Sequence, residues 1–120
     1  MSVILIVEDE MFIRQCAEGT IEDLGHATLA AEDLAEALIH LAGPLLIDAL
    51  FVDIRLNRLA SGGYDVADQG IAIQPGMRVL YTSGTPLTPA MTAQFVGGGQ
   101  FIQKPYSSVQ LENSLGELLR

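Results

Sequence analysis

The chain has 120 residues, a length that suits one domain, and we expect a single domain over residues 1–120. Hydrophobic residues make up 49% of it and charged residues only 18%, which indicates a packed globule rather than a disordered segment. The net charge of −9 argues against direct binding of nucleic acid, because such binding requires a clustered positive surface. No stretch approaches the roughly 20 apolar residues of a membrane span, so we expect no membrane insertion and a cytoplasmic location.

Cys16 is the only cysteine, which excludes a disulfide within the chain and favours a reducing compartment. It falls within a helical apolar pattern, and this pattern predicts a buried, unreactive thiol. His26 and His40 show no metal-ligand spacing, and we expect them at the surface or at helix ends.

Strand and helix patterns alternate along the first half of the chain. A continuous β-branched and apolar run over residues 3–7 predicts a strand that is covered on both faces. Apolar residues at helical spacing then predict a helix over 13–24, closed by a glycine. A weaker strand is expected over 27–31, and a helix with a capping box at its start over 33–41. The next apolar run, 49–52, predicts a third strand that leads directly into an aspartate.

In the second half, a loop is expected over 54–63 and an irregular helix over 64–73. A strand over 79–81 and a helix over 89–96 follow, and then a short strand over 101–102 and a final helix over 108–120. Thr88 is expected to cap the helix that begins at Pro89, and the three glycines at 97–99 are expected to end it. Ser107 and Gln110 have the spacing of a capping box for the final helix.

Five strands alternating with five helices, without repeats or linkers, are typical of an α/β fold with helices on both faces of a parallel sheet. Right-handed crossovers leave few topologies, and we expect a doubly wound (βα)5 flavodoxin-like sandwich with the strand order 2-1-3-4-5. That order is taken from known folds of this kind and not from the residues themselves. It makes the first and third strands neighbours.

Polar residues follow the apolar strands at the points where the strands end. They are Glu8 and Asp9 after the first strand, Asp53 after the third, Ser83 and Gly84 after the fourth, and Lys104 after the fifth. Ligand sites of open parallel sheets lie outside the carboxyl ends of the strands, where the strand order reverses. We therefore expect these residues to converge.

Three carboxylates, those of Glu8, Asp9 and Asp53, would repel one another by roughly 3 kcal/mol per pair at about 5 Å and an effective dielectric near 20. This repulsion predicts a compensating cation, and ligands that are all oxygen suit Mg²⁺. Lys104 is the only lysine in the chain. Its point charge on a flexible stem suits pairing first with a carboxylate and then with a phosphoryl group.

The chemistry that this arrangement predicts is phosphoryl transfer to a carboxylate, with Asp53 as the nucleophile. Asp9 is the expected main protein ligand of Mg²⁺, and Glu8 is expected to support it from the outer coordination sphere or through water. Ser83 offers a hydroxyl to a phosphoryl oxygen, and Gly84 leaves space for the group to enter.

Each of these features also has a purely structural interpretation. Acidic residues after strands often cap helices, and an aspartate such as Asp53 can simply open a loop. Thr82-Ser83-Gly84 alone is an ordinary turn, and Lys104-Pro105 alone is a common strand terminator. The functional interpretation rests on all four features falling at the correct strand ends of one fold.

Over essentially its whole length the chain resembles the response-regulator receiver family. The resemblance lies in Ile4-Leu5-Ile6-Val7-Glu8-Asp9-Glu10, Leu50-Phe51-Val52-Asp53, Val79-Leu80-Tyr81-Thr82-Ser83-Gly84 and Lys104-Pro105-Tyr106. It implies that Asp53 is phosphorylated by a sensor histidine kinase or a histidine phosphotransfer protein. It also implies that Mg²⁺ is held by Asp9, Asp53 and the backbone carbonyl of Arg55, and that the domain does not turn over an external substrate.

The resemblance makes Ser83 the switch hydroxyl and Phe101 the switch aromatic. On phosphorylation, Ser83 would move toward the phosphoryl group and Phe101 would turn inward. These movements would reshape the surface of the fourth helix, fifth strand and fifth helix. The same surface is where a homodimer would form. Thr82 is expected to face away from the site, because successive residues of a strand face opposite sides. The Lys104–Pro105 bond is expected to be cis, as is usual in the family.

The sequence departs from the family pattern after Asp53, where the usual proline is missing and the glycines come late, so the conformation of 54–63 is left open. Arg55 and Thr85 occupy positions that tune dephosphorylation in the family, so the lifetime of the phosphoryl group is left open as well. Phe101 lacks a hydroxyl, and any switch there works through packing alone.

Several alternatives stay open on the residues alone. The chain is either a stand-alone receiver or one domain of a larger hybrid kinase or DNA-binding regulator. A phosphohydrolase with an aspartyl nucleophile would need a second acid two residues later, where Arg55 stands. A flavin-binding module would need a Ser/Thr/Gly-rich phosphate loop after the first strand, where Glu8-Asp9-Glu10 would repel phosphate.

Overall fold

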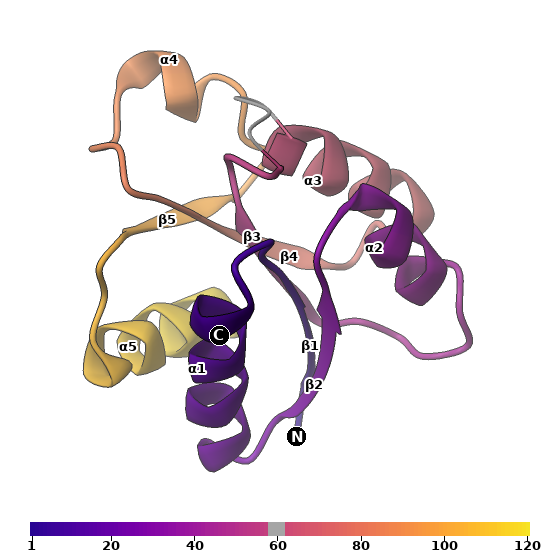
Figure 1. The fold of residues 1–120 in the computed structure, drawn as a ribbon. Coiled ribbons are helices and arrows are strands. Elements are labelled where there is room, and N and C mark those ends of the chain that lie inside the picture. The colour runs from indigo at the N-terminus through magenta and orange to yellow at the C-terminus, as the bar shows by residue number, and fades with distance from the viewer. Residues whose placement is uncertain (58–61) are drawn as a thin grey trace.

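The computed structural model describes residues 1–57 and 62–120, in which five parallel strands form one sheet with helices on both faces (Figure 1). The strands are β1 (Val3–Val7), β2 (Ala27–Ala31), β3 (Ala49–Asp53), β4 (Arg78–Ser83) and β5 (Gln100–Gln103). The helices are α1 (Met11–Asp23), α2 (Leu34–Leu41), α3 (Gly62–Ile73), α4 (Pro89–Thr92) and α5 (Ser108–Leu118). None of these helices is long and apolar enough to cross a membrane. The strand order β2-β1-β3-β4-β5 confirms the predicted fold class and topology.

The parallel pairing brings the carboxyl ends of the strands to one edge of the sheet. Val7 at the end of β1 lies beside Val52 of β3, so the residues after Val7 lie next to Asp53. Asp53 in turn lies beside Thr82 of β4. Ser83 pairs with Gln103 of β5, which directly precedes a lysine. The backbone register therefore determines which polar side chains meet.

Alternate residues of the central strands enter two apolar clusters on opposite faces of the sheet. Leu5 and Val52 pack on the side of α2 and α3, whereas Ile4 and Phe51 pack on the side of α1 and α5. Burying one such side chain stabilises the fold by about 2 kcal/mol. Because both faces are covered, β1 and β3 are apolar at every position before their carboxyl ends.

Side-chain caps fix the starts of α2, α4 and α5, and Thr88 caps α4 as predicted by accepting the N–H of Met91 at 3.2 Å. Ser107 accepts the N–H of Gln110 at 3.1 Å and the Gln110 side chain accepts the N–H of Ser107 at 2.8 Å, which confirms the predicted capping box of α5. Asp33 caps α2 by accepting the N–H of Glu36 at 2.9 Å. The Glu36 carboxylate, however, accepts the N–H of Glu32 instead of that of Asp33, so only half of the predicted box forms.

The helix predicted to continue to the glycines at 97–99 is much shorter than expected, because α4 ends at Thr92. Beyond Thr92 the backbone continues as turns, in which the N–H of Gln94 donates to the carbonyl of Met91 at 3.0 Å and that of Phe95 to the carbonyl of Thr92 at 3.1 Å, and Tyr81 on β4 contacts the next residues. The ring of Phe95 stacks on that of Tyr81 at a centroid distance of 4.1 Å, and the N–H of Val96 donates to the Tyr81 hydroxyl at 2.9 Å. These contacts with the sheet draw the chain off the helical path.

Helix α3 begins at Gly62, earlier than predicted, and approaches the end of β3 very closely. The N–H of Gly63 donates to the carbonyl of Ile54 at 2.8 Å. A Cβ atom at Gly63 would lie 2.2 Å from the carbonyl oxygen of Asp53, so only glycine fits there. Of the loop that was left open over 54–63, residues 58–61 lie outside the described part of the chain.

The prediction that Cys16 is buried is wrong, because its side chain is exposed. The buried residues of α1 are Ala17 and Ile21, which face the sheet. One residue turns a helix by about 100°, so Cys16 lies well away from the line through Ala17 and Ile21. The apolar pattern was therefore assigned the wrong rotational phase.

Candidate functional site

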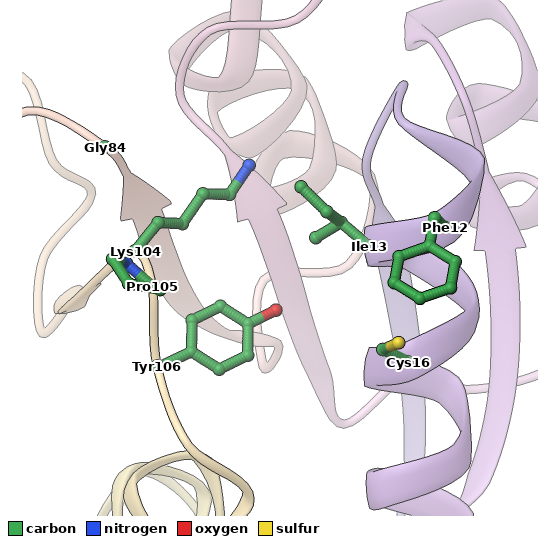
Figure 2. Close-up of a pocket in the computed structure, with 7 residues that line it drawn as sticks. All are labelled: Phe12, Ile13, Cys16, Gly84, Lys104, Pro105 and Tyr106. Carbon is green, nitrogen blue, oxygen red and sulfur yellow. The ribbon is translucent and has the colours of Figure 1, made fainter.

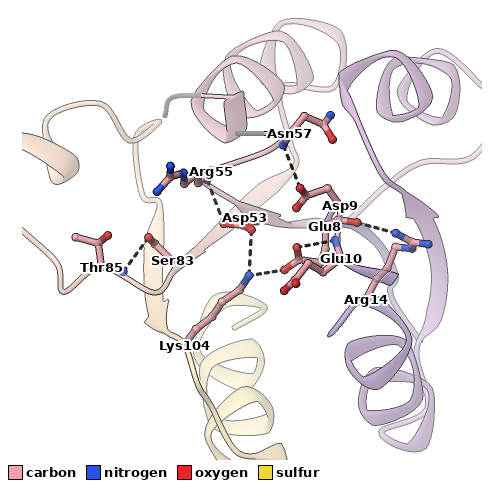
Figure 3. A network of polar contacts seen from close by, with 10 residues as sticks. All are labelled: Glu8, Asp9, Glu10, Arg14, Asp53, Arg55, Asn57, Ser83, Thr85 and Lys104. Atoms are coloured by element: carbon pink, nitrogen blue, oxygen red, sulfur yellow. Dashed lines mark hydrogen bonds and ion pairs between the residues drawn. The ribbon is translucent and has the colours of Figure 1, made fainter. Parts of the chain in front are cut away.

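The carboxyl ends of β1, β3 and β5 bring three carboxylates and one ammonium group together (Figure 3). One oxygen from each of Glu8, Asp9 and Asp53 lies within 4.8 Å of the others. The side chains of Glu8 and Asp53 are buried, with whole-residue exposures of 4% and 6%, whereas Asp9 is half-buried. The structure thus brings together the three acidic residues that the sequence placed at this edge.

Lys104 lies between the two buried carboxylates. Its Nζ atom is 2.5 Å from Oε1 of Glu8 and 3.0 Å from Oδ2 of Asp53. Burial lowers the pKa of Lys104, but its hydrogen bonds to Glu8 and Asp53 outweigh burial, so that pKa is raised above its usual value. The ammonium group therefore stays charged at neutral pH and offsets part of the repulsion.

Glu8 is the carboxyl group whose protonation the site changes most clearly. Burial, with a smaller contribution from the charge of Asp53, raises the pKa of Glu8 from 4.5 to about 7, although the hydrogen bond from Lys104 acts in the opposite direction. Its Oε2 atom accepts the N–H of Glu10 at 3.2 Å. Glu8 therefore keeps its proton to a higher pH than a carboxyl group in water does.

A cavity of about 470 Å³ opens above the acidic cluster. Its lining residues are Asp9, Glu10, Asp53, Arg55, Ser83, Gly84, Thr85 and Lys104. The Ser83 hydroxyl accepts the N–H of Thr85 at 3.1 Å and keeps its own proton available for donation. Thr82 does not line this cavity, and its buried hydroxyl has no hydrogen-bond partner among the described residues. A Cβ atom at Gly84 would meet no atom within 4 Å outside its chain neighbours, so there is open space beside Ser83.

The family model of the response regulator receiver domain matches residues 4–116. The chain belongs to the response regulator receiver family. Its likeness to individual receiver proteins extends over nearly the whole chain. The structure of a response regulator receiver protein from Sinorhizobium medicae WSM419 has a TM-score of 0.86 and 29% identity, and the match covers 98% of this chain and 94% of that one.

Other relatives of this receiver are longer than the chain. A "Probable transcriptional regulator ycf27" from Guillardia theta is 27% identical over 117 residues, which are 98% of this chain and 45% of the relative. NtrX from Brucella abortus has a TM-score of 0.87 at 28% identity, with 98% of this chain but 26% of the NtrX chain covered. The chain spans about half the length of the curated relatives that it matches.

Two further sequence predictions concern Phe101 on β5 and the peptide bond after Lys104. Phe101 on β5 is half-buried and stacks against Phe95 at a centroid distance of 6.4 Å, and it does not line the acidic cavity. The Lys104–Pro105 peptide bond is cis, which confirms the expectation for that bond.

A second, mostly apolar cavity of about 540 Å³ adjoins the acidic one (Figure 2). It lies between the first turns of α1 and the segment after β5, and its lining residues are Phe12, Ile13, Cys16, Gly84, Lys104, Pro105 and Tyr106. Gly84 and Lys104 line both cavities. Burial is the main reason that the pKa of Tyr106 is raised to about 12, so its hydroxyl stays neutral.

Two residues that hold the loops around the site were not predicted from the sequence. Arg14 on α1 donates from its guanidinium to the carbonyl of Glu8 at 2.8 Å. Asn57, after β3, donates its backbone N–H to Oδ2 of Asp9 at 3.2 Å. The only available signal was the residue type of Asn57, because asparagine tolerates left-handed backbone conformations.

Proposed function

We propose that this receiver accepts a phosphoryl group on Asp53, in the presence of Mg²⁺, from the phosphohistidine of a sensor kinase or a phosphotransfer protein. The observation that carries the proposal is the position of Lys104, whose ammonium group bridges Asp53 and Glu8 in a buried site. The hydrogen bond from Lys104 orients the Asp53 carboxylate, the proposed nucleophile. The ammonium group also lies within reach of any group that is attached to the Asp53 carboxylate.

The residues present fit Mg²⁺. The cluster supplies only oxygen ligands, which Mg²⁺ prefers, and its three carboxylates are offset by one lysine. Asp9 and Asp53 would hold the ion, with the backbone carbonyl of Arg55 as a third ligand and Glu8 in support. When bound, Mg²⁺ supplies neutralisation of the charge on the phosphoryl oxygens.

In the proposed reaction, an oxygen of Asp53 forms a bond to phosphorus while the phosphorus–nitrogen bond of phosphohistidine breaks. The imidazole nitrogen of the donor keeps the electron pair of that bond. Lys104 moves its hydrogen bond from the Asp53 carboxylate to a phosphoryl oxygen, and the Ser83 hydroxyl donates to another. The open space beside Gly84 admits the group. We further propose that Ser83 and Phe101 pass the change to the surface of α4, β5 and α5.

Turnover of an external substrate by a phosphohydrolase mechanism is less well supported. Such an enzyme needs an acid two residues after the nucleophile to protonate the leaving group. Arg55 stands there, and its side chain is exposed at the rim of the cavity. We therefore propose a phosphoacceptor that assists its own phosphorylation and dephosphorylation.

The phosphoacceptor is tested by incubation with a small acyl phosphate and Mg²⁺, followed by intact-mass measurement. We expect one phosphoryl adduct on the wild type and none on Asp53→Asn. Asp23→Asn is the matched control, because it makes the same chemical change at the exposed far end of α1 and should carry the wild-type adduct. No adduct on the wild type, or an equal adduct on Asp53→Asn, would contradict the assignment. Unchanged Mg²⁺ affinity in Asp9→Ala would contradict the ligand role of Asp9.

We also propose where the phosphodonor protein docks. A protein that presents phosphohistidine to Asp53 must cover the rim of the acidic cavity, and Met11 and Phe12 stand beside that rim with 61% and 76% of their surface exposed. The apolar cavity behind Phe12 offers further surface to the same partner. We expect Phe12→Ser to slow transfer from a phosphohistidine protein while leaving the acyl phosphate reaction unchanged. Equal slowing of both reactions would contradict docking at this face.

The lengths of the relatives favour a second proposal, that this receiver regulates further domains. The chain covers 45% of a relative named as a transcriptional regulator and 26% of NtrX. The complete reading frame of the gene tests this directly, and a stop codon after Arg120 would contradict it. A homodimer through α4, β5 and α5 stays a prediction, and analytical ultracentrifugation with and without phosphorylation tests it.

A further inference from the structure

The loop after β3 donates backbone hydrogen bonds to two carboxylates of the acidic cluster. The N–H of Arg55 donates to Oδ1 of Asp53 at 3.1 Å, and the N–H of Asn57 donates to Oδ2 of Asp9 at 3.2 Å (Figure 3). The loop therefore connects a residue at the end of β3 with one that follows β1. Two backbone groups of one loop thus hold two carboxylates side by side.

The apolar residues of this loop explain why these two N–H groups are available. Ile54 and Leu56 are buried, with 5% and 2% of their surface exposed, and they anchor the loop in the core. Arg55 and Asn57, which alternate with them, are exposed. Buried and exposed side chains thus alternate along residues 54–57. The core therefore holds the loop in the position from which it reaches both carboxylates.

Asn57 has an unusual backbone conformation at the end of this loop. Its φ of 51° is the one positive value for a residue other than glycine among residues 1–57 and 62–120. Asparagine is one of the few residues that adopt such values readily. A proline at this position would have φ near −65° and no N–H, so it would make neither the turn nor the hydrogen bond.

The hydrogen bond from the Asn57 N–H holds the Asp9 side chain in the cluster. Asp9 is the most exposed carboxylate of the cluster, and within the described part of the chain Asn57 is its one hydrogen-bond donor. Without that donor, repulsion from Glu8 and Asp53 would favour turning the Asp9 side chain out into water. The hydrogen bond uses Oδ2 and leaves Oδ1 of Asp9 free for a cation.

We propose that Asn57 is a positioning residue for the Mg²⁺ site, and that its backbone N–H holds Asp9 beside Asp53 before the ion binds. This inference rests on the proposed function of the acidic cluster. A neutral N–H orients the carboxylate without the full positive charge that would compete with a cation. Groups that orient metal ligands in this way raise metal affinity, and their loss costs about 10- to 100-fold.

The test compares Mg²⁺ dissociation constants of the wild type, Asn57→Gly and Asn57→Pro by isothermal titration calorimetry. Asn57→Gly keeps the N–H and adopts positive φ freely, so we expect an affinity close to that of the wild type. Asn57→Pro removes both, and we expect binding at least about 10-fold weaker. Melting temperatures of the metal-free proteins show whether each variant is folded. Equal Mg²⁺ affinities of folded Asn57→Pro and wild type would overturn the inference and leave the proposed function intact.

A second variant covers the case in which Asn57→Pro does not fold. Replacing the amide before Asn57 by an ester puts an oxygen in place of the N–H and keeps the side chain and its φ preference, and the same loss of Mg²⁺ affinity is expected. An ester variant that binds Mg²⁺ as tightly as the wild type overturns the inference. A wild-type protein that binds no Mg²⁺ overturns the metal site of the proposed function, and the role of Asn57 with it.

Discussion

Removing the charge of Asp9 should stabilise the metal-free protein. Asp9→Asn keeps an oxygen that accepts the N–H of Asn57 but removes one negative charge from the cluster. In the wild type, a carboxylate oxygen of Asp9 lies within 4.8 Å of oxygens of Glu8 and Asp53. Two full charges at this distance repel by about 3 kcal/mol at an effective dielectric of 20, and by about 1 kcal/mol in bulk water. Because Asp9 is half-buried and Lys104 offsets its neighbours, we expect the free energy of unfolding to rise by about 1 kcal/mol.

Urea unfolding followed by circular dichroism, at pH 8 and low salt with a chelator, measures this difference. The midpoint should rise at constant m-value, and added NaCl should shrink the gain because it screens the repulsion. Mg²⁺ should reverse the order, because an ion at 100 times its dissociation constant stabilises the wild type by about 2.7 kcal/mol. An Asp9→Asn protein no more stable than the wild type in chelator would refute the reasoning. It would show that Lys104 and the backbone donors already offset all of the repulsion.

Three further changes test the electrostatics and the packing. The pKa of Glu8 is raised from 4.5 to about 7, so between these pH values the Glu8 carboxyl group is protonated in the folded protein and ionised in the unfolded chain. Stability should therefore fall by up to about 3 kcal/mol as the pH rises from 4.5 through 7, and the difference between wild type and Glu8→Gln in urea unfolding should show this fall. Lys104→Met leaves Glu8 and Asp53 buried without a cation, and it should cost about 3 kcal/mol of unfolding free energy at pH 8 in chelator. Tyr81→Phe removes the acceptor of the Val96 N–H and should cost about 1 kcal/mol; an unchanged midpoint would show that water satisfies this N–H.

The sequence sufficed for the fold and for the composition of the acidic cluster because both follow from one rule. Buried parallel strands give continuous apolar runs, and the residues that end such runs meet at one edge of the sheet. Glu8 and Lys104 are separated by 96 positions in the chain, yet their places at strand ends, combined with the strand order of known folds, predicted that they would meet. The strand order itself had to be taken from known folds, because no residue of this chain specifies it.

The remaining features depend on contacts that a local pattern does not contain. Helix α4 stops at Thr92 because Tyr81 on a neighbouring strand holds Phe95 and Val96. The exposure of Cys16 depends on the rotational phase of α1, which a run of apolar residues on several sides of the helix did not settle. These errors arise where tertiary contacts override local propensity.

The charges of the site also explain why its stability and its proposed function are opposed. Glu8, Asp9, Asp53 and Lys104 together carry a net charge of two negative units when Glu8 is ionised, and Glu10 and Arg55 at the rim cancel each other. One divalent cation would balance the two negative charges of this cluster. A second lysine in place of the cation would balance only one of them and would occupy the space that the phosphoryl group needs. A site that keeps two uncompensated charges is therefore less stable without an ion but ready to bind one. We infer that the instability of the metal-free cluster and its affinity for Mg²⁺ have the same cause, which is the uncompensated negative charge. Substitutions that stabilise the metal-free protein by removing this charge should therefore weaken Mg²⁺ binding.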